Sequence, residues 1–459
     1  MLSDKVLTRA ARIVGDSNIG PGDDYFRGNG QSPSLKAAKA GSPEEIQDLV
    51  SLAAEQGFSI YTVRGRFAPS SIRNMDGLLL DLSRMDGIIE LDARNMKARI
   101  EAGVTYEQLS EAVEPEGLQV LLPISATSRS VLRSNIDRDV LLGGSSFRKS
   151  SISVFKAVLG NGEVWGSGTQ QLGSEGRPDF GEDQGPQLSG AFSASEDVFG
   201  IPFQCTVYLY PKYEDRKVLL FGFAERQGAL DFIKTVARRE HCFQCAGADP
   251  AYWGALTGRD GLSCVENTEL FSHWPWSVVL SLEHVKKLVD FLDGAVHEEA
   301  SSFGGEPIDG APRELAAAAL DEPWYRWDYD TMSGDSHVVD YFCYPRSAGE
   351  FFDTAGKAIG TPDGVALGHV VVPVSFGGSM FCETVLYTRP EDFRKAKEPA
   401  LAAYRAVFEK GAVIDRPTGD LAAWMFQQAD PGYNRVLRIL KKQLDPCGVL
   451  NPGALLKDF

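Results

Sequence analysis

The segment SVLRSNIDRD, Ser130–Asp139, decides the fold, and three other stretches of sequence belong with it. Upstream lie YTVRGRFAPSS at Tyr61–Ser71 and GVTYEQLSEAVEPEGL at Gly103–Leu118. Downstream, the chain runs on from Asp139 into LGNGEVWGSG, which ends at Gly168. The last stretch, LDPCGVLNPG at Leu444–Gly453, stands at the far end of the chain. Their order and their distances along the chain are informative only when the stretches are interpreted together.

The composition sets the outer limits on fold and function. A chain of 459 residues with 43% hydrophobic content can bury a large core, and this length predicts two or three domains. A net charge of −17 argues against general binding to nucleic acid or to an anionic membrane, because the field of the protein would repel both. We expect a cytoplasmic protein, since the first residues lack a secretory signal and no apolar run has membrane-spanning length.

Cysteine and histidine spacing gives no sign of a metal site. The seven cysteines are an odd number in a long chain, which favours reduced thiols over a disulfide framework. Cys242 and Cys245 form one C-x-x-C pair, but no second pair stands at zinc-ribbon spacing. We therefore expect no bound metal.

The amino-terminal region alternates short helices and strands. Ser42–Gln56 begins with a serine cap and a glutamate three residues on, and its apolar residues fall on one face, which predicts an amphipathic helix. A second helix is expected at Tyr106–Val113, after a threonine cap. Ser153–Leu159 and Val164–Trp165 are predicted to form a hairpin with a type I′ turn at Asn161-Gly162. Further strands are expected at Ile60–Val63, Leu78–Leu82, Ile88–Leu91 and Ala98–Ala102. This order predicts an α+β fold.

The middle of the chain has a different pattern. Ser167–Ser189 is rich in glycine and polar residues and is predicted to be a loop over the surface. From 212 to 415, helices and strands alternate in a way that predicts one antiparallel sheet backed by helices. The helices are expected around Gln227–Arg239, Glu283–Ala295 and Glu391–Lys410, and the strands around Val218–Phe223, Trp276–Leu282, Val338–Tyr344, His369–Val374 and Ser379–Thr388.

The quoted segments, in their order, resemble the flavoprotein family of vanillyl-alcohol oxidase and 4-cresol dehydrogenase, which has the PCMH-type FAD-binding fold. The resemblance covers most of the chain and implies FAD as cofactor. It also implies an FAD-binding domain split between residues 1–211 and 416–459. Residues 212–415 then form the cap domain, which covers the flavin ring and carries much of the substrate pocket.

Two loops of this family surround the pyrophosphate of the cofactor. Glycines there let backbone N–H groups approach the phosphates closely. The resemblance places Arg64, Gly65, Arg66 and Phe67 in the first loop. Small polar and glycine residues are expected after the Gly-Arg pair, but Phe67 brings bulk, and the proline two residues later has no N–H to donate.

Ser130 and Val131 match the second loop, where the family has Ser-Val-Leu, but Arg133 stands at a glycine position of the family. Two interpretations of Arg133 follow. Its guanidinium could grip a phosphate in place of the lost backbone donors. Alternatively, it fills space that a cofactor would occupy, so that the fold persists with weak or no FAD affinity.

The remaining cofactor-side segments follow the family more closely. SEDVFGI, Ser195–Ile201, resembles the short motif in which Gly200-Ile201 runs beside the adenosine part of FAD, and we assign Ser195 to the same site. Asn451 belongs to the carboxy-terminal signature that closes against the flavin domain. On its own, that stretch predicts a helix end followed by a turn.

The substrate side departs from the family. A phenolic substrate is bound there as its phenolate by two tyrosines and an arginine, and hydride then leaves the benzylic carbon for the flavin. Arg416 matches the arginine, whereas Asp415 stands at a tyrosine position, and these two are the candidate catalytic residues. A carboxylate beside the arginine would neutralise it and repel a phenolate.

Two classes of function follow from these residues. The first is an FAD-dependent oxidoreductase, or a subunit of one, that transfers hydride from a small aromatic substrate to flavin. The second is a catalytically silent flavin-fold subunit that scaffolds or regulates an intact relative. The resemblance implies a homo-oligomer or a heteromer with a related flavoprotein subunit, with an electron-carrier protein as a further partner.

Overall fold

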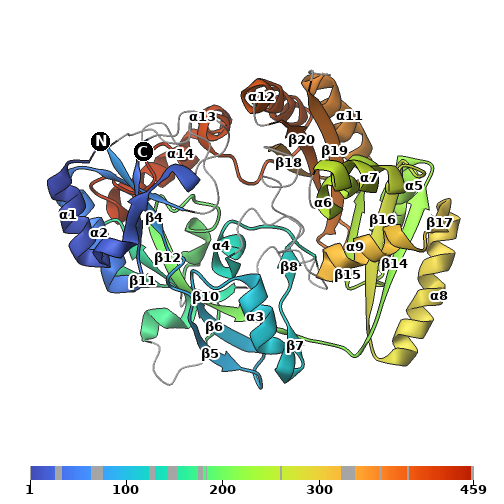
Figure 1. Ribbon diagram of the computed structural model, residues 1–459, viewed down its shortest axis with the longest axis horizontal. Coiled ribbons are helices and arrows are strands. Elements are labelled where there is room, and N and C mark those ends of the chain that lie inside the picture. Colours follow the sequence, from blue (N-terminus) through green and yellow to red (C-terminus); the bar gives the residue numbers. More distant parts are fainter. Residues whose placement is uncertain are drawn as a thin grey trace.

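The computed structural model forms two lobes, and both chain ends lie in the same one (Figure 1). It describes residues 2–25, 34–63, 76–123, 130–142, 152–173, 179–181, 183, 185–258, 261–321, 336–360, 364–389 and 392–455. The first lobe comprises residues up to 211 together with the segment from 419 onward, and the second comprises residues 215–409. Both lobes combine helices with sheets, which confirms the predicted α+β class.

The first lobe contains two main sheets. The smaller has the order β1-β2-β4-β3, with the last three strands parallel, and α1 (Asp4–Val14) and α2 (Pro43–Gln56) pack beside it. Its strands are Ile19–Pro21 (β1), Lys36–Lys39 (β2), Ser59–Thr62 (β3) and Gly77–Asp81 (β4). The larger is antiparallel with the order β11-β10-β12-β6-β5. Its strands are Val164–Gly166 (β11), Ile152–Leu159 (β10), Gly200–Tyr208 (β12), Lys97–Glu101 (β6) and Ile88–Asp92 (β5).

Short elements connect these sheets to the rest of the molecule. Helices α3 (Tyr106–Val113) and α4 (Val131–Ile136) follow β6 along the chain. Two small antiparallel pairs lead toward the second lobe. They join β7 (Leu118–Gln119) to β13 (Tyr210–Pro211) and β8 (Leu122–Pro123) to β9 (Leu141–Leu142).

Local signals explain why the predicted helices begin where they do. The Ser42 hydroxyl accepts a hydrogen bond from the Glu45 N–H, which caps α2. Thr105 and Gln108 form a reciprocal capping box at the start of α3, and this helix has the predicted bounds. The prediction of a type I′ turn at Asn161-Gly162 is wrong, because of these two residues only Gly162 has a positive φ, of 83°. The Gly162 N–H donates to the Leu159 carbonyl, so the hairpin closes through a longer loop with glycine in the left-handed position.

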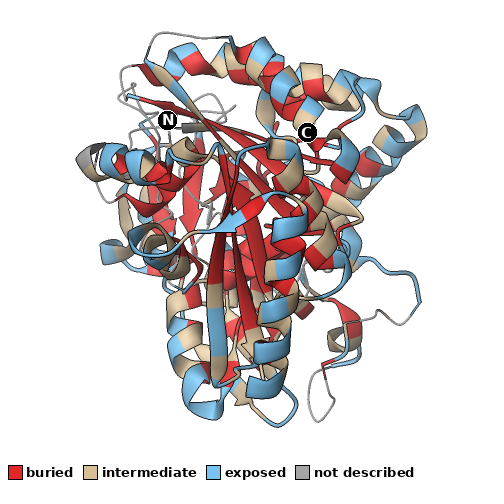
Figure 2. Cartoon of the chain, turned by 90° about the vertical axis from the view of Figure 1, so that its right-hand side faces the viewer, coloured by how far each residue is buried: buried red, intermediate tan, exposed pale blue. Residues whose placement is uncertain are grey.

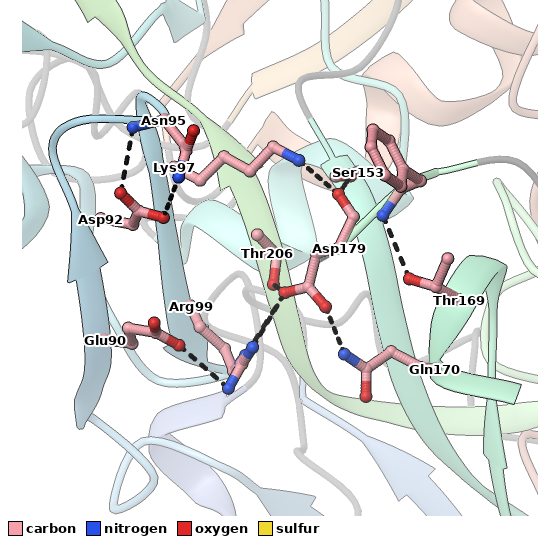
Figure 3. Close-up of polar contacts among 11 residues, drawn as sticks. Glu90, Asp92, Asn95, Lys97, Arg99, Ser153, Thr169, Gln170, Asp179 and Thr206 are labelled. Atoms are coloured by element: carbon pink, nitrogen blue, oxygen red, sulfur yellow. Dashed lines mark hydrogen bonds and ion pairs between the residues drawn. The ribbon is translucent and has the colours of Figure 1, made fainter. Parts of the chain in front are cut away.

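The outer face of the larger sheet holds a polar network centred on Asp179, which is buried (Figure 3). Asp179 receives hydrogen bonds from Thr206, Gln170, Arg99, Ser153 and Lys97. Its carboxylate accepts from Thr206 Oγ1 and Gln170 Nε2, each at 2.5 Å, and from Arg99 Nη2 at 3.1 Å. The loop predicted over the surface at Ser167–Ser189 is therefore anchored to the sheet through this residue.

The second lobe is built on one seven-stranded antiparallel sheet with the order β17-β14-β16-β15-β19-β20-β18. Its strands are Gly305–Pro307 (β17), Asp215–Phe223 (β14), Trp276–His284 (β16), Gln244–Ala248 (β15), Val365–Val374 (β19), Ser379–Thr388 (β20) and Ser336–Cys343 (β18). Figure 2 shows the buried strands behind helices whose outer faces are exposed. The single antiparallel sheet is as predicted.

Helices cover both faces of this sheet. One apolar core joins it to α5 (Arg226–Arg238), α8 (Lys286–Ser302), α11 (Ala348–Ile359) and α12 (Phe393–Glu409). A second core joins the opposite face to α6 (Pro250–Thr257), α7 (Gly261–Phe271) and α9 (Ala311–Asp321). The helix expected at Glu283–Ala295 begins later, because β16 continues through His284 in register with β14.

The end of the chain returns to the first lobe. Helices α13 (Gly419–Gln428) and α14 (Pro431–Leu444) lead to a turn at which Leu450 forms a parallel bridge to Ile60 of β3. Leu437, Val449 and Leu450 are buried in the core of the first lobe. These contacts are the ones that a split domain requires, and the proposed boundaries at 211/212 and 415/416 stay predictions.

Candidate cofactor and substrate site

The start of α4 carries Ser130 and Val131, two of the predicted cofactor residues. The Ser130 hydroxyl accepts from the Arg133 N–H at 3.2 Å and donates to the Ala102 carbonyl. The Val131 N–H donates to the Val104 carbonyl at 3.0 Å. These groups therefore hold α4 against the segment that follows β6.

Arg133 lies in α4 with 3% of its side chain exposed, and its guanidinium forms an ion pair with Asp197, which is 1% exposed. The other terminal nitrogen donates to the Pro202 carbonyl at 3.4 Å. The charge of Arg133 is thus balanced by a protein carboxylate. Neither interpretation made from sequence included this partner, although Asp197 stands within the quoted segment SEDVFGI.

The turn that carries Ser195 has an unusual backbone. Ala194, Glu196 and Asp197 have φ angles of 52°, 56° and 55°, a conformation that is rare for residues other than glycine. The Ala194 N–H donates to the Ile136 carbonyl at 2.8 Å, which ties the turn to the end of α4. Strain of this kind persists where the surrounding structure enforces it, often at functional sites.

Lys441 of α14 holds the same turn from the other side. Its buried ammonium donates to the Val198 carbonyl at 2.9 Å, to the Leu450 carbonyl at 2.7 Å and to Asp445 at 2.6 Å. One side chain thus joins the turn to the carboxy-terminal signature. Gly200 and Ile201 follow in β12, where they pair with β10 and are fully buried.

Asn451 fixes the end of β3. Its carboxamide oxygen accepts from the Thr62 N–H at 3.0 Å, and its nitrogen donates to the Thr62 hydroxyl at 3.1 Å. The segment that begins at Arg64 follows directly in sequence. Arg64, Gly65, Arg66 and Phe67 themselves lie outside the described residues.

Arg416 lies where the two lobes meet. Its guanidinium forms an ion pair with Asp139, which follows α4, and lies 3.5 Å from the carboxylate of Asp340 in β18. Asp415, predicted to neutralise it, pairs instead with Arg138, at 3.3 Å between carboxylate and guanidinium. The prediction that Asp415 balances Arg416 is therefore wrong, and Asp139 and Asp340 compensate its charge instead.

Tyr404 of α12 completes this cluster. Its hydroxyl donates to the Asp340 carboxylate and accepts from the Asp340 N–H at 3.2 Å. Burial, reinforced by the charge of Asp340, raises the pKa of Tyr404 well above its usual value. Burial alone would lower the pKa of Arg416, but Asp139 and Asp340 raise it overall, so the guanidinium stays charged.

Sequence reasoning missed Asp139, Asp340 and Tyr404. Asp139 belongs to the quoted segment SVLRSNIDRD, but its partner stands 277 residues further on. Asp340 and Tyr404 carry no local signal, since only the packing of α12 on β18 brings them together. Near Asp340, Tyr341 is buried, whereas Tyr344 is 65% exposed.

A first lobe closed by the chain end and a second lobe on an antiparallel sheet are the arrangement that the resemblance implies for a flavoprotein with a cap domain. Comparison with known proteins shows what the chain is similar to. Residues 35–167 match the FAD binding domain. Over 99% of both chains, the protein is 24% identical to an uncharacterized FAD-linked oxidoreductase of Mycobacterium tuberculosis. It is 26% identical to the flavoprotein subunit of 4-cresol dehydrogenase of Pseudomonas putida, over 45% of this chain and 43% of that one.

Solved structures agree with this result. The fold matches p-cresol methylhydroxylase with a TM-score of 0.77 and 20% identity, and 4-ethylphenol oxidase of Gulosibacter chungangensis with a TM-score of 0.79 and 17% identity. Each match covers 98% of this chain and 96% of the other. These findings confirm the resemblance: the chain has an FAD binding domain and the PCMH-type flavoprotein fold. FAD is accordingly the cofactor of this domain.

One buried polar atom fits a cofactor beside the strained turn. Within the described part of the chain, no residue hydrogen-bonds the buried Ser195 hydroxyl. An unsatisfied buried hydroxyl is costly, and a polar group of FAD at this turn would satisfy it. No group of three or more metal-ligating side chains occurs among the residues described, and none of the helices found there is long and apolar enough to cross a membrane.

Proposed function

We propose that the protein is an FAD-dependent oxidoreductase, or a subunit of one, that transfers hydride from a small organic substrate to flavin. The observation that carries this proposal is the turn at Ala194–Asp197. Three of its residues have a left-handed backbone conformation. Contacts from α4, which include the ion pair of Arg133, and from Lys441 hold the turn in place. The Ser195 hydroxyl within the turn is buried and unsatisfied. Strained turns of this kind cluster at functional sites, which favours a bound cofactor here.

Two groups of residues are proposed to hold FAD. We assign Ser195, Gly200 and Ile201 to the adenosine side, and the segments at Arg64–Phe67 and Ser130–Arg133 to the pyrophosphate side. Asn451 acts by fixing the end of β3, from which the first of these segments starts. Bound FAD supplies the hydride acceptor, and Arg416 at the junction of the lobes is proposed to face the substrate.

A small aromatic substrate is the first choice, because p-cresol methylhydroxylase and 4-ethylphenol oxidase share the fold. We further propose that the protein works as a homo-oligomer or with a related flavoprotein subunit, and that an electron-carrier protein accepts its electrons. The 4-cresol dehydrogenase relative is itself named as a flavoprotein subunit.

The second candidate is a catalytically silent subunit of an intact relative. The ion pair of Arg133 with Asp197 favours it, because this pair fills the position at which the family has a glycine. In this case the fold would be kept as a scaffold.

Absorbance spectroscopy separates the two candidates. We expect the purified protein to show flavin absorbance, or to acquire it when apoprotein is titrated with FAD, and anaerobic substrate to bleach that absorbance. A preparation that stays colourless after incubation with FAD would refute the enzyme and leave the silent subunit. Acid precipitation would then show whether any flavin is covalently attached.

A further inference from the structure

The junction of the two lobes brings together a cation and two carboxylates from distant parts of the chain. Asp139 comes from the first lobe, Asp340 and Tyr404 come from the second, and Arg416 lies between them on the segment that joins the lobes. Ligand sites occur preferentially between domains, where side chains from several elements converge. The charge of this cluster therefore bears on what can bind there.

We propose that Asp139 and Asp340 determine the charge of the substrate, so that the site takes an uncharged hydroxyl compound, such as a neutral phenol or alcohol, and rejects its anion. This inference rests on the proposed function in placing the substrate beside Arg416. It departs from the role of a phenolate-binding arginine, because a free cation is required for that role.

The positive charge of Arg416 is already compensated. Asp139 contacts one terminal nitrogen directly, and Asp340 lies 3.5 Å from the other. Asp139 and Asp340 are 2% and 13% exposed at their side chains, so water screens these interactions poorly. An oxyanion that approached Arg416 would have to displace a carboxylate or meet its repulsion.

The neighbouring groups do not restore a free cation. Arg138 is paired with Asp415, so both arginines described at this junction have a carboxylate partner. The Tyr404 hydroxyl donates its hydrogen bond to Asp340 and is therefore not available to donate to a substrate oxygen. Tyr404 instead holds the Asp340 carboxylate in place beside Arg416.

The test compares the two ionisation states of one ligand. The probe is para-nitrophenol, with its affinity for the full-length protein measured by calorimetry below and above the pKa of the probe. We expect the wild type to bind the neutral form at least about tenfold more tightly than the anion, so that the bound probe has a higher pKa than the free probe. Asp340→Asn should reduce or invert that preference by about tenfold, because it removes one of the two charges that compensate Arg416.

Two further variants make the result specific. Asp139→Asn removes the other compensating charge and should shift the preference in the same direction. The same shift in both variants would not be explained by misfolding of one of them. The control is Asp353→Asn, which removes the same charge from an ion pair with Arg226 outside this cluster, so the preference should stay as in the wild type. Circular dichroism verifies the fold of each variant.

The outcomes divide clearly. The inference is overturned if the wild type binds the anion as tightly as the neutral form or binds neither form. It is also overturned if the preference for the neutral form survives both substitutions. Flavin binding is measured separately. A colourless protein with the predicted preference refutes the proposed function alone, whereas a flavin-loaded protein that prefers the anion refutes this inference alone.

Discussion

At the scale of the residue, Arg133 shows how a single side chain can serve the fold and the site at once. The resemblance expects a glycine at this position, yet the Arg133 guanidinium is buried against Asp197 in the turn that we assign to the cofactor. Removing one partner from a buried ion pair costs about 3–5 kcal/mol, because the other charge loses its compensation. The pair is therefore expected to stabilise the turn whether or not FAD is bound.

We predict that Arg133→Met lowers the free energy of unfolding by about 3–5 kcal/mol. The double variant Arg133→Met/Asp197→Asn should lose much less, since it also removes the uncompensated charge, and asparagine tolerates the left-handed conformation at position 197. Urea denaturation measures both values. Equal losses in the two variants would contradict a stabilising role for the pair.

The same double variant tests the phosphate contact. If Arg133 also grips FAD, the folded double variant should bind the cofactor more weakly, because one charge-assisted contact contributes about 1.5–3 kcal/mol. Unchanged affinity in an FAD titration would show that Arg133 serves the turn alone.

At the scale of the element, α14 links the chain end to the proposed cofactor turn. Lys441 donates to carbonyls of Val198 and Leu450, and Asp445 accepts from the Val449 and Leu450 N–H groups. Because Lys441 is buried, no water molecule readily takes its place. The helix therefore holds two segments that are far apart in sequence.

We predict that Lys441→Met lowers the free energy of unfolding by about 3 kcal/mol, since it leaves a buried carboxylate and two carbonyls without their donor. Hydrogen exchange should also become faster at the Leu450 and Asn451 amides. The matched control is Lys442→Met, an exposed neighbour, which should change stability by less than about 0.5 kcal/mol. Equal effects of the two substitutions would refute the bridging role.

Elements with local signals were predictable from sequence. The capping box at Thr105 set the start of α3, and the run Ser153–Leu159 before Asn161-Gly162 marked β10 and its hairpin partner. The junction at Arg416 could not be predicted in the same way. Its partners are 277 and 76 residues away, and what brings them together is the packing of one lobe on the other. The resemblance located Arg416 but not the carboxylates that balance it.

At the scale of the whole molecule, two kinds of ion pair join the lobes. Arg416 connects Asp139 to Asp340 within the protein, whereas Lys397 of α12 pairs with Asp420 of α13 at the surface, at 2.9 Å. Exposed pairs of this second kind contribute about 0–1 kcal/mol, and buried pairs cost several kcal/mol when they are broken. The buried cluster should therefore dominate the coupling between the lobes.

The last prediction concerns this coupling. Arg416→Met leaves Asp139 and Asp340 without their shared cation, so we expect it to lower stability by about 3–5 kcal/mol. We also expect it to divide thermal unfolding into two transitions, because the first lobe has one apolar core and the face of the second lobe under α5, α8, α11 and α12 has another. Differential scanning calorimetry measures both effects. Lys397→Met removes a cation from the same junction at an exposed pair and should leave the thermogram almost unchanged. If Lys397→Met also divided the transition, or if Arg416→Met unfolded in one step at the wild-type temperature, the buried cluster would not be what holds the lobes together.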